Sequence, residues 1–104
     1  MTASNVSLRQ LRVFVTLARV LNFREAAGLV HLSQSALSSA INNLEESLAT
    51  KLFDRSTRHV ELTEAGRALL PTVERILIDL DESLTDVRAL GQGDRGSLSV
   101  GCLF

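Results

Sequence analysis

Three candidate N-capping residues, Ser7, Asn22 and Ser33, divide the first half of this 104-residue chain into short helices. The first helix is expected to follow Ser7 and to reach Leu21, because apolar residues recur there at three- and four-residue steps. Asn22 begins a second helix that ends before Ser33, which provides a new cap for a third helix. The third helix continues to about Leu48. The sequence therefore predicts two helices in tandem, joined by a tight turn.

The apolar residues of these helices predict which faces are buried. The first helix has a wide apolar arc, and we expect it to be covered from two sides. Its main stripe is Leu8, Leu11, Phe14, Val15, Ala18 and Leu21, widened by Val13, Leu17 and Val20. The inward residues of the second helix are expected to be Phe23, Ala26, Ala27 and Val30. Those of the third helix are expected to be Leu37, Ala40, Ile41, Leu44 and Leu48.

A hairpin and a long helix are expected next. Phe53, Val60 and Leu62 indicate two short strands around a polar turn at residues 56–59. Thr63 caps a helix that is expected to run to residue 90. Pro71 removes one hydrogen bond inside this helix, so a kink or break is expected near residues 66–70.

The long helix carries an apolar stripe of its own. It is formed by Leu69, Val73, Ile76, Leu77, Leu80, Leu84 and Val87. The stripe either packs within the monomer or forms a dimer seam. A helix of this length cannot be buried by so small a head, which favours the dimer. After it come three glycines within residues 91–96, and residues 97–104 alternate like a strand. We expect the chain to be part of a larger protein.

Composition excludes several classes of protein. No run of apolar residues exceeds three, so a membrane span or signal-peptide core is not expected. The single cysteine, Cys102, excludes an internal disulfide framework and fits a cytoplasmic protein. The formal charge of −1 conceals an uneven distribution: residues 1–60 carry seven basic and four acidic groups, and residues 61–104 carry four and eight. The sequence thus joins a basic half to an acidic half.

The outward face of the third helix suits DNA recognition. In a helix–turn–helix the second helix enters the major groove, and short polar side chains let its backbone approach the bases. The side chains expected to face bases are Gln34, Ser35, Ser38, Ser39 and Asn42. The residues expected to contact phosphates or to form the wing at the hairpin tip are Arg24, Ser33, Arg55, Thr57 and Arg58. Of these, Arg58 is expected to reach the minor groove.

Several motifs occur together in this chain. They are Ala26-Ala27, the run from Leu32 to Ser38, Ile41, Leu44-Glu45, Leu52-Phe53-Asp54-Arg55, Arg58, and the run from Leu62 to Gly66. In their order and spacing the chain resembles the LysR-type transcriptional regulators over roughly residues 6–90.

The resemblance implies a mainly α-helical fold: a winged helix–turn–helix with a two-stranded wing, followed by a long dimerisation linker helix. It implies a DNA-binding domain at residues 6–63 with the motif at 23–42, and a linker at 64–90. Residues 91–104 would be a hinge and the first strand of an effector-binding domain. It also implies a homodimer, with tetramers in full-length proteins. A small-molecule effector is expected only for that further domain. A proline at Pro71 is often tolerated in the linker helix of this family.

The chain departs from the family at the recognition helix. The family usually has proline at Ser35, often arginine at Ser39, Asn42 or Asn43, and glycine at Ala49. Without arginine on this face, a guanidinium cannot read guanine there, and we expect Gln34, Asn42 and the serines to read adenine or to bind through water. More of the binding should depend on the wing and on DNA shape.

Other readings of the same residues remain. The histidines His31 and His59 are expected to be surface residues, and Cys102 an inward strand residue. The acids at Glu45, Glu46 and residues 79–86 are expected to be solvated. We expect no enzyme, metal or cofactor, because no paired carboxylates, phosphate-binding glycine loop or nucleophile–base pair occurs. The alternative function is a helical interaction module that dimerises and binds protein instead of DNA.

Overall fold

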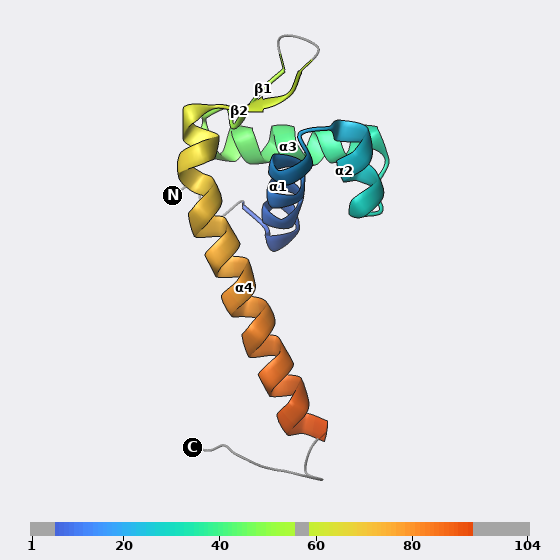
Figure 1. The fold of residues 1–104 in the computed structure, drawn as a ribbon, viewed down its shortest axis with the longest axis vertical. Coiled ribbons are helices and arrows are strands. Elements are labelled where there is room, and N and C mark those ends of the chain that lie inside the picture. Colours follow the sequence, from blue (N-terminus) through green and yellow to red (C-terminus); the bar gives the residue numbers. More distant parts are fainter. Residues whose placement is uncertain (1–5, 56–58, 93–104) are drawn as a thin grey trace. The chain divides into compact units, whose positions relative to one another are not determined.

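The computed structural model describes residues 6–55 and 59–92 (Figure 1). The elements follow in the order α1 (Leu8–Val20), α2 (Phe23–Leu29), α3 (Gln34–Leu48), β1 (Phe53–Asp54), β2 (Glu61–Leu62) and α4 (Glu64–Gln92). β1 and β2 pair antiparallel, with Phe53 opposite Leu62 and Asp54 opposite Glu61. The expected mainly α-helical fold with a two-stranded hairpin is confirmed. Thr57, Arg58, Cys102 and the strand expected at residues 97–104 lie outside the described residues.

Side-chain caps begin the first three helices at the expected residues. The Ser7 hydroxyl accepts a hydrogen bond from the Gln10 N–H at 3.1 Å, and the Gln10 side chain accepts one from the Ser7 N–H at 3.0 Å. Asn22 and Ser33 accept from the N–H groups three positions later, at 2.8 and 3.1 Å. Each cap therefore satisfies a backbone donor that the helix itself leaves unpaired.

The chain divides into two compact units, Met1–Glu74 and Arg75–Phe104. In the first unit, α1, α2 and α3 pack pairwise around a core to which β1 also contributes. Its largest fully buried side chains are Val13, Phe14, Leu17, Leu37, Ile41, Leu44 and Leu52. The Phe14 and Phe53 rings meet edge to face, 5.6 Å apart between centroids. Leu8 and Leu21, expected in the stripe of α1, are exposed because they lie at its two ends.

The start of α4 is fixed to the segment just before β1. Thr63 caps the helix, because its Oγ1 accepts from the Gly66 N–H at 3.1 Å and donates to the Lys51 carbonyl at 2.7 Å. Gly66 lies so close to the Leu52 carbonyl that a Cβ there would overlap it. The Thr63 N–H donates to the same carbonyl at 2.9 Å.

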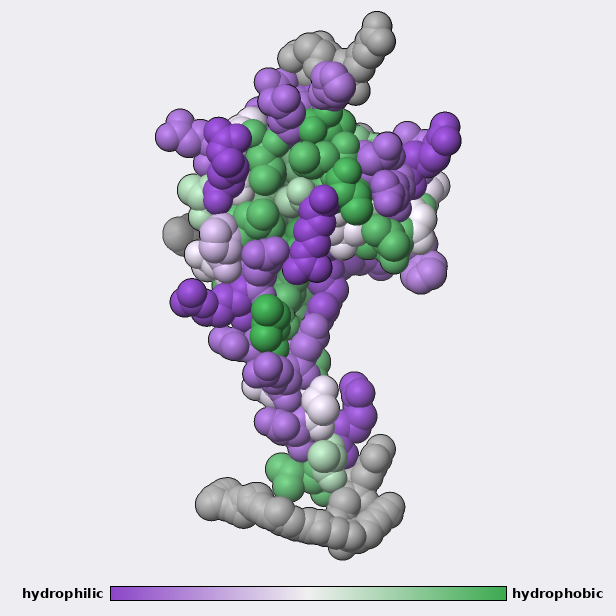
Figure 2. Space-filling view, viewed as in Figure 1, coloured by the Kyte–Doolittle hydropathy of each residue, from purple (hydrophilic) through white to green (hydrophobic). Residues whose placement is uncertain are grey.

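α4 continues as one helix through Pro71, so the break that periodicity predicts near residues 66–70 is wrong, and the proline is tolerated as the resemblance implies. A proline removes a single backbone hydrogen bond, and the residues on both sides of Pro71 remain helical. The described part of the second unit is the C-terminal part of this helix. Its side chains are largely exposed, including Leu84 at 47%, Val87 at 63% and Leu90 at 71%. Figure 2 shows hydrophobic and hydrophilic side chains interspersed along the part of the molecule that Figure 1 labels α4. No helix among the described residues is apolar over a length that could cross a membrane.

Candidate nucleic-acid interface

α2 and α3 form a tight helix–turn–helix. Ala26 and Ala27 are buried, and such small side chains let α2 approach its neighbours closely. The turn contains His31 in the left-handed conformation, at a φ of 60°. It is closed by a hydrogen bond of 2.9 Å from the Leu32 N–H to the Ala27 carbonyl. Ser33 follows directly as the cap of α3, so the turn fixes where that helix begins.

The outward face of α3 carries the residues that were expected to face bases. Gln34, Ser35, Ser39 and Asn42 are exposed, whereas Ser38 is half-buried. α3 contains neither lysine nor arginine. The structure therefore brings all five side chains onto one helix and gives that face hydrogen-bonding groups without positive charge.

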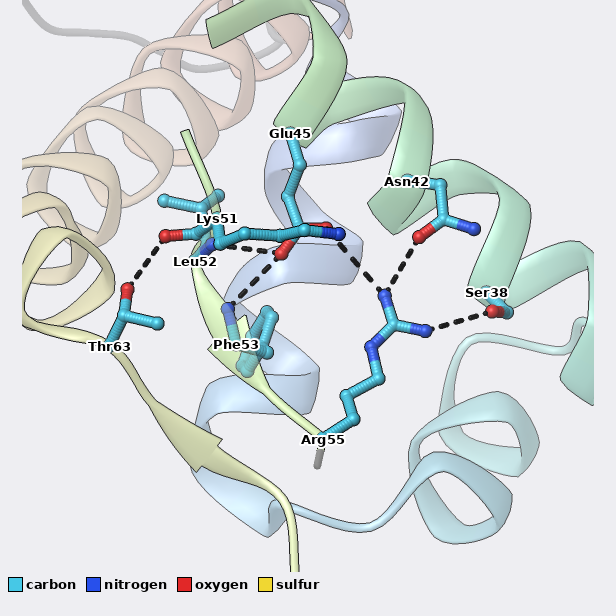
Figure 3. Close-up of polar contacts among 8 residues, drawn as sticks. All are labelled: Ser38, Asn42, Glu45, Lys51, Leu52, Phe53, Arg55 and Thr63. Carbon is cyan, nitrogen blue, oxygen red and sulfur yellow. Dashed lines mark hydrogen bonds and ion pairs between the residues drawn. The ribbon is translucent and has the colours of Figure 1, made fainter. Parts of the chain in front are cut away.

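Arg55, just after β1, supplies a guanidinium to this face from another element (Figure 3). Its Nη1 donates to the Ser38 hydroxyl at 3.2 Å, and its Nη2 donates to the Asn42 Oδ1 at 2.9 Å. Its Cζ atom also lies 4.7 Å from the centre of the Phe23 ring, which is cation–π distance. Arg55 was expected near the DNA backbone, and here it connects the hairpin to α2 and α3. Its phosphate contact stays a prediction.

Glu45 is buried, with 4% of its side chain exposed, so the expectation that it is solvated is wrong. Its Oε2 accepts hydrogen bonds from the Leu52 N–H at 2.8 Å and the Phe53 N–H at 3.1 Å. Its Oε1 lies 3.7 Å from both Lys51 Nζ and Arg55 Nη2 (Figure 3). The carboxylate thus joins α3 to the start of the hairpin and offsets part of the charge of Arg55. The exposed neighbour Glu46 agrees with expectation.

Two grooves border the outward face of α3. One, of about 500 Å³, is lined by Asn42, Lys51, Phe53, Asp54, Arg55 and Thr63. The other, of about 450 Å³, lies at the start of α2 and is lined by Leu21, Asn22, Phe23, Arg24, Gln34 and Val60. The second groove brings Arg24 together with Gln34, two of the residues singled out from the sequence. Thr57 and Arg58, expected at the wing tip, fall outside the described residues.

The expected stripe of α4 is only partly buried. Val73 and Leu77 are buried, at 2% and 8% exposure, and Ile76, Leu84 and Val87 are exposed. Leu69 and Leu80 are half-buried. Among the described residues, no group of His, Cys, Asp and Glu side chains is arranged to hold a metal ion.

Sequence reasoning missed the structural roles of Phe23, Glu45 and Lys51 beside this face. For Glu45 a signal was present, because it lies four residues after Ile41 and three before Leu48, within the buried stripe of α3. No comparable signal predicts the contact of Phe23 with Arg55, which are far apart in the sequence.

Comparison with known proteins gives a consistent result. Residues 8–67 match the profile described as "bacterial regulatory helix-turn-helix protein, lysR family". Over 96 residues, or 92% of its length, the chain is 45% identical to the HTH-type transcriptional regulator BudR of Klebsiella aerogenes, of which it covers 67%. It is 43% identical, again over 92% of its length, to the transcriptional regulator YfeR of Shigella flexneri, of which it covers only 31%. The chain therefore spans less than a third of that relative.

A solved structure shares the fold. The DNA-binding domain of BenM, in complex with catB site 1 DNA, superposes with a TM-score of 0.79 at 31% identity. The match covers 84% of this chain and 97% of that one. The matched profile, the sequence relatives and this superposition agree with the helix–turn–helix and hairpin described above. The chain belongs to the LysR family of bacterial regulatory helix–turn–helix proteins and carries that family's DNA-binding domain.

Proposed function

We propose that this domain binds an inverted-repeat operator as a homodimer and serves a cytoplasmic transcriptional regulator. α3 lies in the major groove with Gln34, Ser35, Ser38, Ser39 and Asn42 toward the bases. The wing lies at the minor groove. The observation that carries the proposal is the outward face of α3, where exposed short polar side chains follow a capped helix start.

Phosphate contacts are assigned around that face. The Ser33 hydroxyl oxygen accepts from the Ala36 N–H and leaves its own hydrogen for a phosphate oxygen. The first N–H groups of α3 form a helix N-terminus, and a helix N-terminus attracts anions such as phosphate. Arg24 is exposed beside Gln34 and provides a cation, and Thr57 with Arg58 completes the contacts at the wing.

The proposal assigns residues 6–63 to DNA binding, residues 64–90 to a linker helix and residues 91–104 to a hinge. In the whole protein a further domain would bind a small-molecule effector, and dimers would associate as tetramers.

Dimerisation is assigned to the stripe on α4. Leu77, Leu80, Leu84 and Val87 follow each other at alternating steps of three and four residues, the spacing of a helix–helix seam. Leu84 and Val87 are about half exposed or more. Full burial of an exposed side chain of this size is worth about 1.5–3 kcal/mol, so burial of the exposed half against a second copy contributes about 1 kcal/mol. Ile76, at 45% exposure, and the half-buried Leu69 would extend this seam toward the start of the helix, whereas Val73 is already buried in the single chain and adds little new burial.

The seam is tested by placing a charge on it. Leu84→Asp should shift the chain from dimer to monomer in sedimentation equilibrium at micromolar concentration, because it buries a carboxylate in an apolar contact. Thr85→Asp adds the same charge to an exposed position off the stripe and should leave the dimer intact. A wild-type chain that is monomeric at tens of micromolar would contradict this assignment.

DNA binding is tested by its salt dependence. Fluorescence anisotropy with random duplex should show affinity that falls as salt rises, since phosphate contacts release counterions. Arg58→Ala should weaken binding and reduce the slope of log K against log salt by about one unit per protomer. Arg88→Ala, on the exposed face of α4, is the matched control and should leave the slope unchanged. Failure to retain DNA even at low salt would favour the interaction module instead.

A further inference from the structure

The amide of Asn42 has a defined orientation, because its partner can only donate. A guanidinium carries five N–H donors and no acceptor. The atom of Asn42 that lies 2.9 Å from Arg55 Nη2 must therefore be the carbonyl oxygen. The NH₂ group of the same amide then points away from Arg55. The Asn42 amide could otherwise adopt either of two flipped orientations, and the bond from Arg55 restricts it to one of them.

Arg55 is itself held from three directions. It contacts the Phe23 ring of α2. Figure 3 shows its contacts with the Ser38 hydroxyl of α3 and the buried carboxylate of Glu45. Its side chain is 31% exposed, so much of it is shielded from water. Glu45 in turn accepts two backbone hydrogen bonds at the start of the hairpin and cannot turn aside without leaving both unpaired. The position of the guanidinium is consequently fixed by the fold, and the position of the Asn42 amide follows from it.

This orientation changes which base Asn42 can read. Adenine is read by asparagine through two bonds, in which the oxygen accepts from N6 and the NH₂ group donates to N7. Here Arg55 donates to one of the oxygen's two lone pairs and holds that oxygen toward the end of β1, so the NH₂ group rather than the oxygen is turned outward. The outward NH₂ group matches a base edge made of acceptors, and guanine presents two of them side by side, N7 and O6. Thymine presents one, O4, and cytosine presents only a donor in the major groove.

We propose that Arg55 is a specificity-determining positioning residue: it turns the Asn42 amide so that α3 presents a donor, which selects guanine at the base that Asn42 contacts. The inference rests on the proposed function and reverses the expectation that Asn42 reads adenine. It also explains how a recognition helix without arginine can prefer guanine. The arginine acts from the hairpin, through an asparagine, rather than from the helix itself.

The test is selection of bound duplexes from a random library with the 104-residue chain and its variants. Asn42→Ala identifies the relevant base, because preference should be lost there alone. In the wild type that position should be guanine, favoured over adenine by about three- to tenfold, the worth of one neutral hydrogen bond. Preference for adenine at that position would overturn the proposal.

Asn42→Asp is the sharper variant. A carboxylate keeps the bond from Arg55 with one oxygen and turns the other outward, so an acceptor replaces the donor at the same place. The selected base should change from guanine to cytosine, whose N4 amine donates. Asn43→Asp introduces the same charge at the exposed neighbouring residue and should leave guanine selected. Equal profiles for the two aspartate variants would overturn the proposal.

Arg55→Met tests the positioning itself. The unbranched side chain can still lie against Phe23 but donates no hydrogen bond, so the Asn42 amide becomes free to turn and adenine should rise to near parity with guanine. Arg55→Lys retains a donor and should keep part of the guanine preference. Circular-dichroism melts show whether each variant is folded, and the Asn42→Asp result stands even if Arg55→Met unfolds. If no form of the chain retains DNA, the proposed function fails; if DNA is bound and Arg55→Met leaves the profile unchanged, this inference alone fails.

Discussion

Ala49 ends α3 in a conformation that alanine adopts at a cost. Its φ of 55° and ψ of 35° lie in the left-handed region, where a Cβ is crowded by the following carbonyl. The conformation closes the helix: the Thr50 N–H donates to the Glu45 carbonyl and the Ala49 N–H to the Glu46 carbonyl, both at 3.1 Å. Glycine is the residue that favours this position, so Ala49→Gly should raise the free energy of unfolding.

The expected gain is the difference between two opposing effects. Relief of the left-handed strain contributes about 1–2 kcal/mol. The greater freedom of glycine in the unfolded chain opposes it by about 0.5–1 kcal/mol. Ala49 is exposed, so loss of its methyl group removes little burial. The net stabilisation should be about 0.5–1 kcal/mol, and the melting temperature should rise by roughly 2–8 °C for a domain of this size.

The measurement is thermal unfolding followed by circular dichroism at fixed protein concentration. Ala68→Gly is the matched control, because Ala68 is also exposed but lies within α4, away from its ends. That variant should lower stability by about 0.5–1 kcal/mol, since glycine is unfavourable inside a helix. Opposite signs for the same chemical change would isolate the effect of the backbone conformation. A decrease of similar size in both variants would refute the reasoning.

Two further predictions concern the junction between α3, the hairpin and α4. Gly66→Ala should destabilise the domain by about 1–3 kcal/mol, because its Cβ would overlap the Leu52 carbonyl and lie 2.7 Å from the Leu62 Cδ2. Gly28→Ala meets no atom within 4 Å, and its melting temperature should stay level or rise. Glu45→Ala leaves two buried N–H groups without acceptors and should cost about 2–5 kcal/mol in urea unfolding. Glu46→Ala, at an exposed position, should change stability by less than about 0.5 kcal/mol; equal losses in both glutamate variants would contradict the role given to the buried carboxylate.

The helix–turn–helix could be predicted because its signals are local. Each capping side chain bonds a backbone N–H only three positions later, so Ser7, Asn22 and Ser33 carried the information for their own helix starts. Thr63 did the same for α4. The exposed face of α3 followed from the helical period once those starts were fixed. For the same reason, the sequence could identify five candidate base-facing residues on one face before any contact was known.

Contacts between distant residues were less accessible. Arg55 lies 13 positions after Asn42 and 17 after Ser38, and no periodic pattern connects a residue beside a strand to a helix face. The position of Glu45 beside Glu46 predicts a solvated acid, although its hydrogen-bond partners are backbone groups seven and eight positions later. At Pro71 the local rule itself was too strict, since α4 remains helical although proline removes one of its backbone hydrogen bonds. For Arg55 and Glu45, tertiary structure outweighed the local expectation.

The distribution of charge fits an interface that relies on geometry more than on attraction. α3 has no basic residue, and the guanidinium that reaches its face is partly offset by a carboxylate 3.7 Å away. A protein whose contacts are mostly cationic binds any duplex, and its affinity depends steeply on salt. In this domain the neutral hydrogen-bonding groups of α3 must instead discriminate by direction, which requires that they be held in place. The network of Glu45, Arg55 and Asn42 provides that restraint. Under the proposed function, the contacts that join the helix to the hairpin are therefore also those that set which base the helix selects.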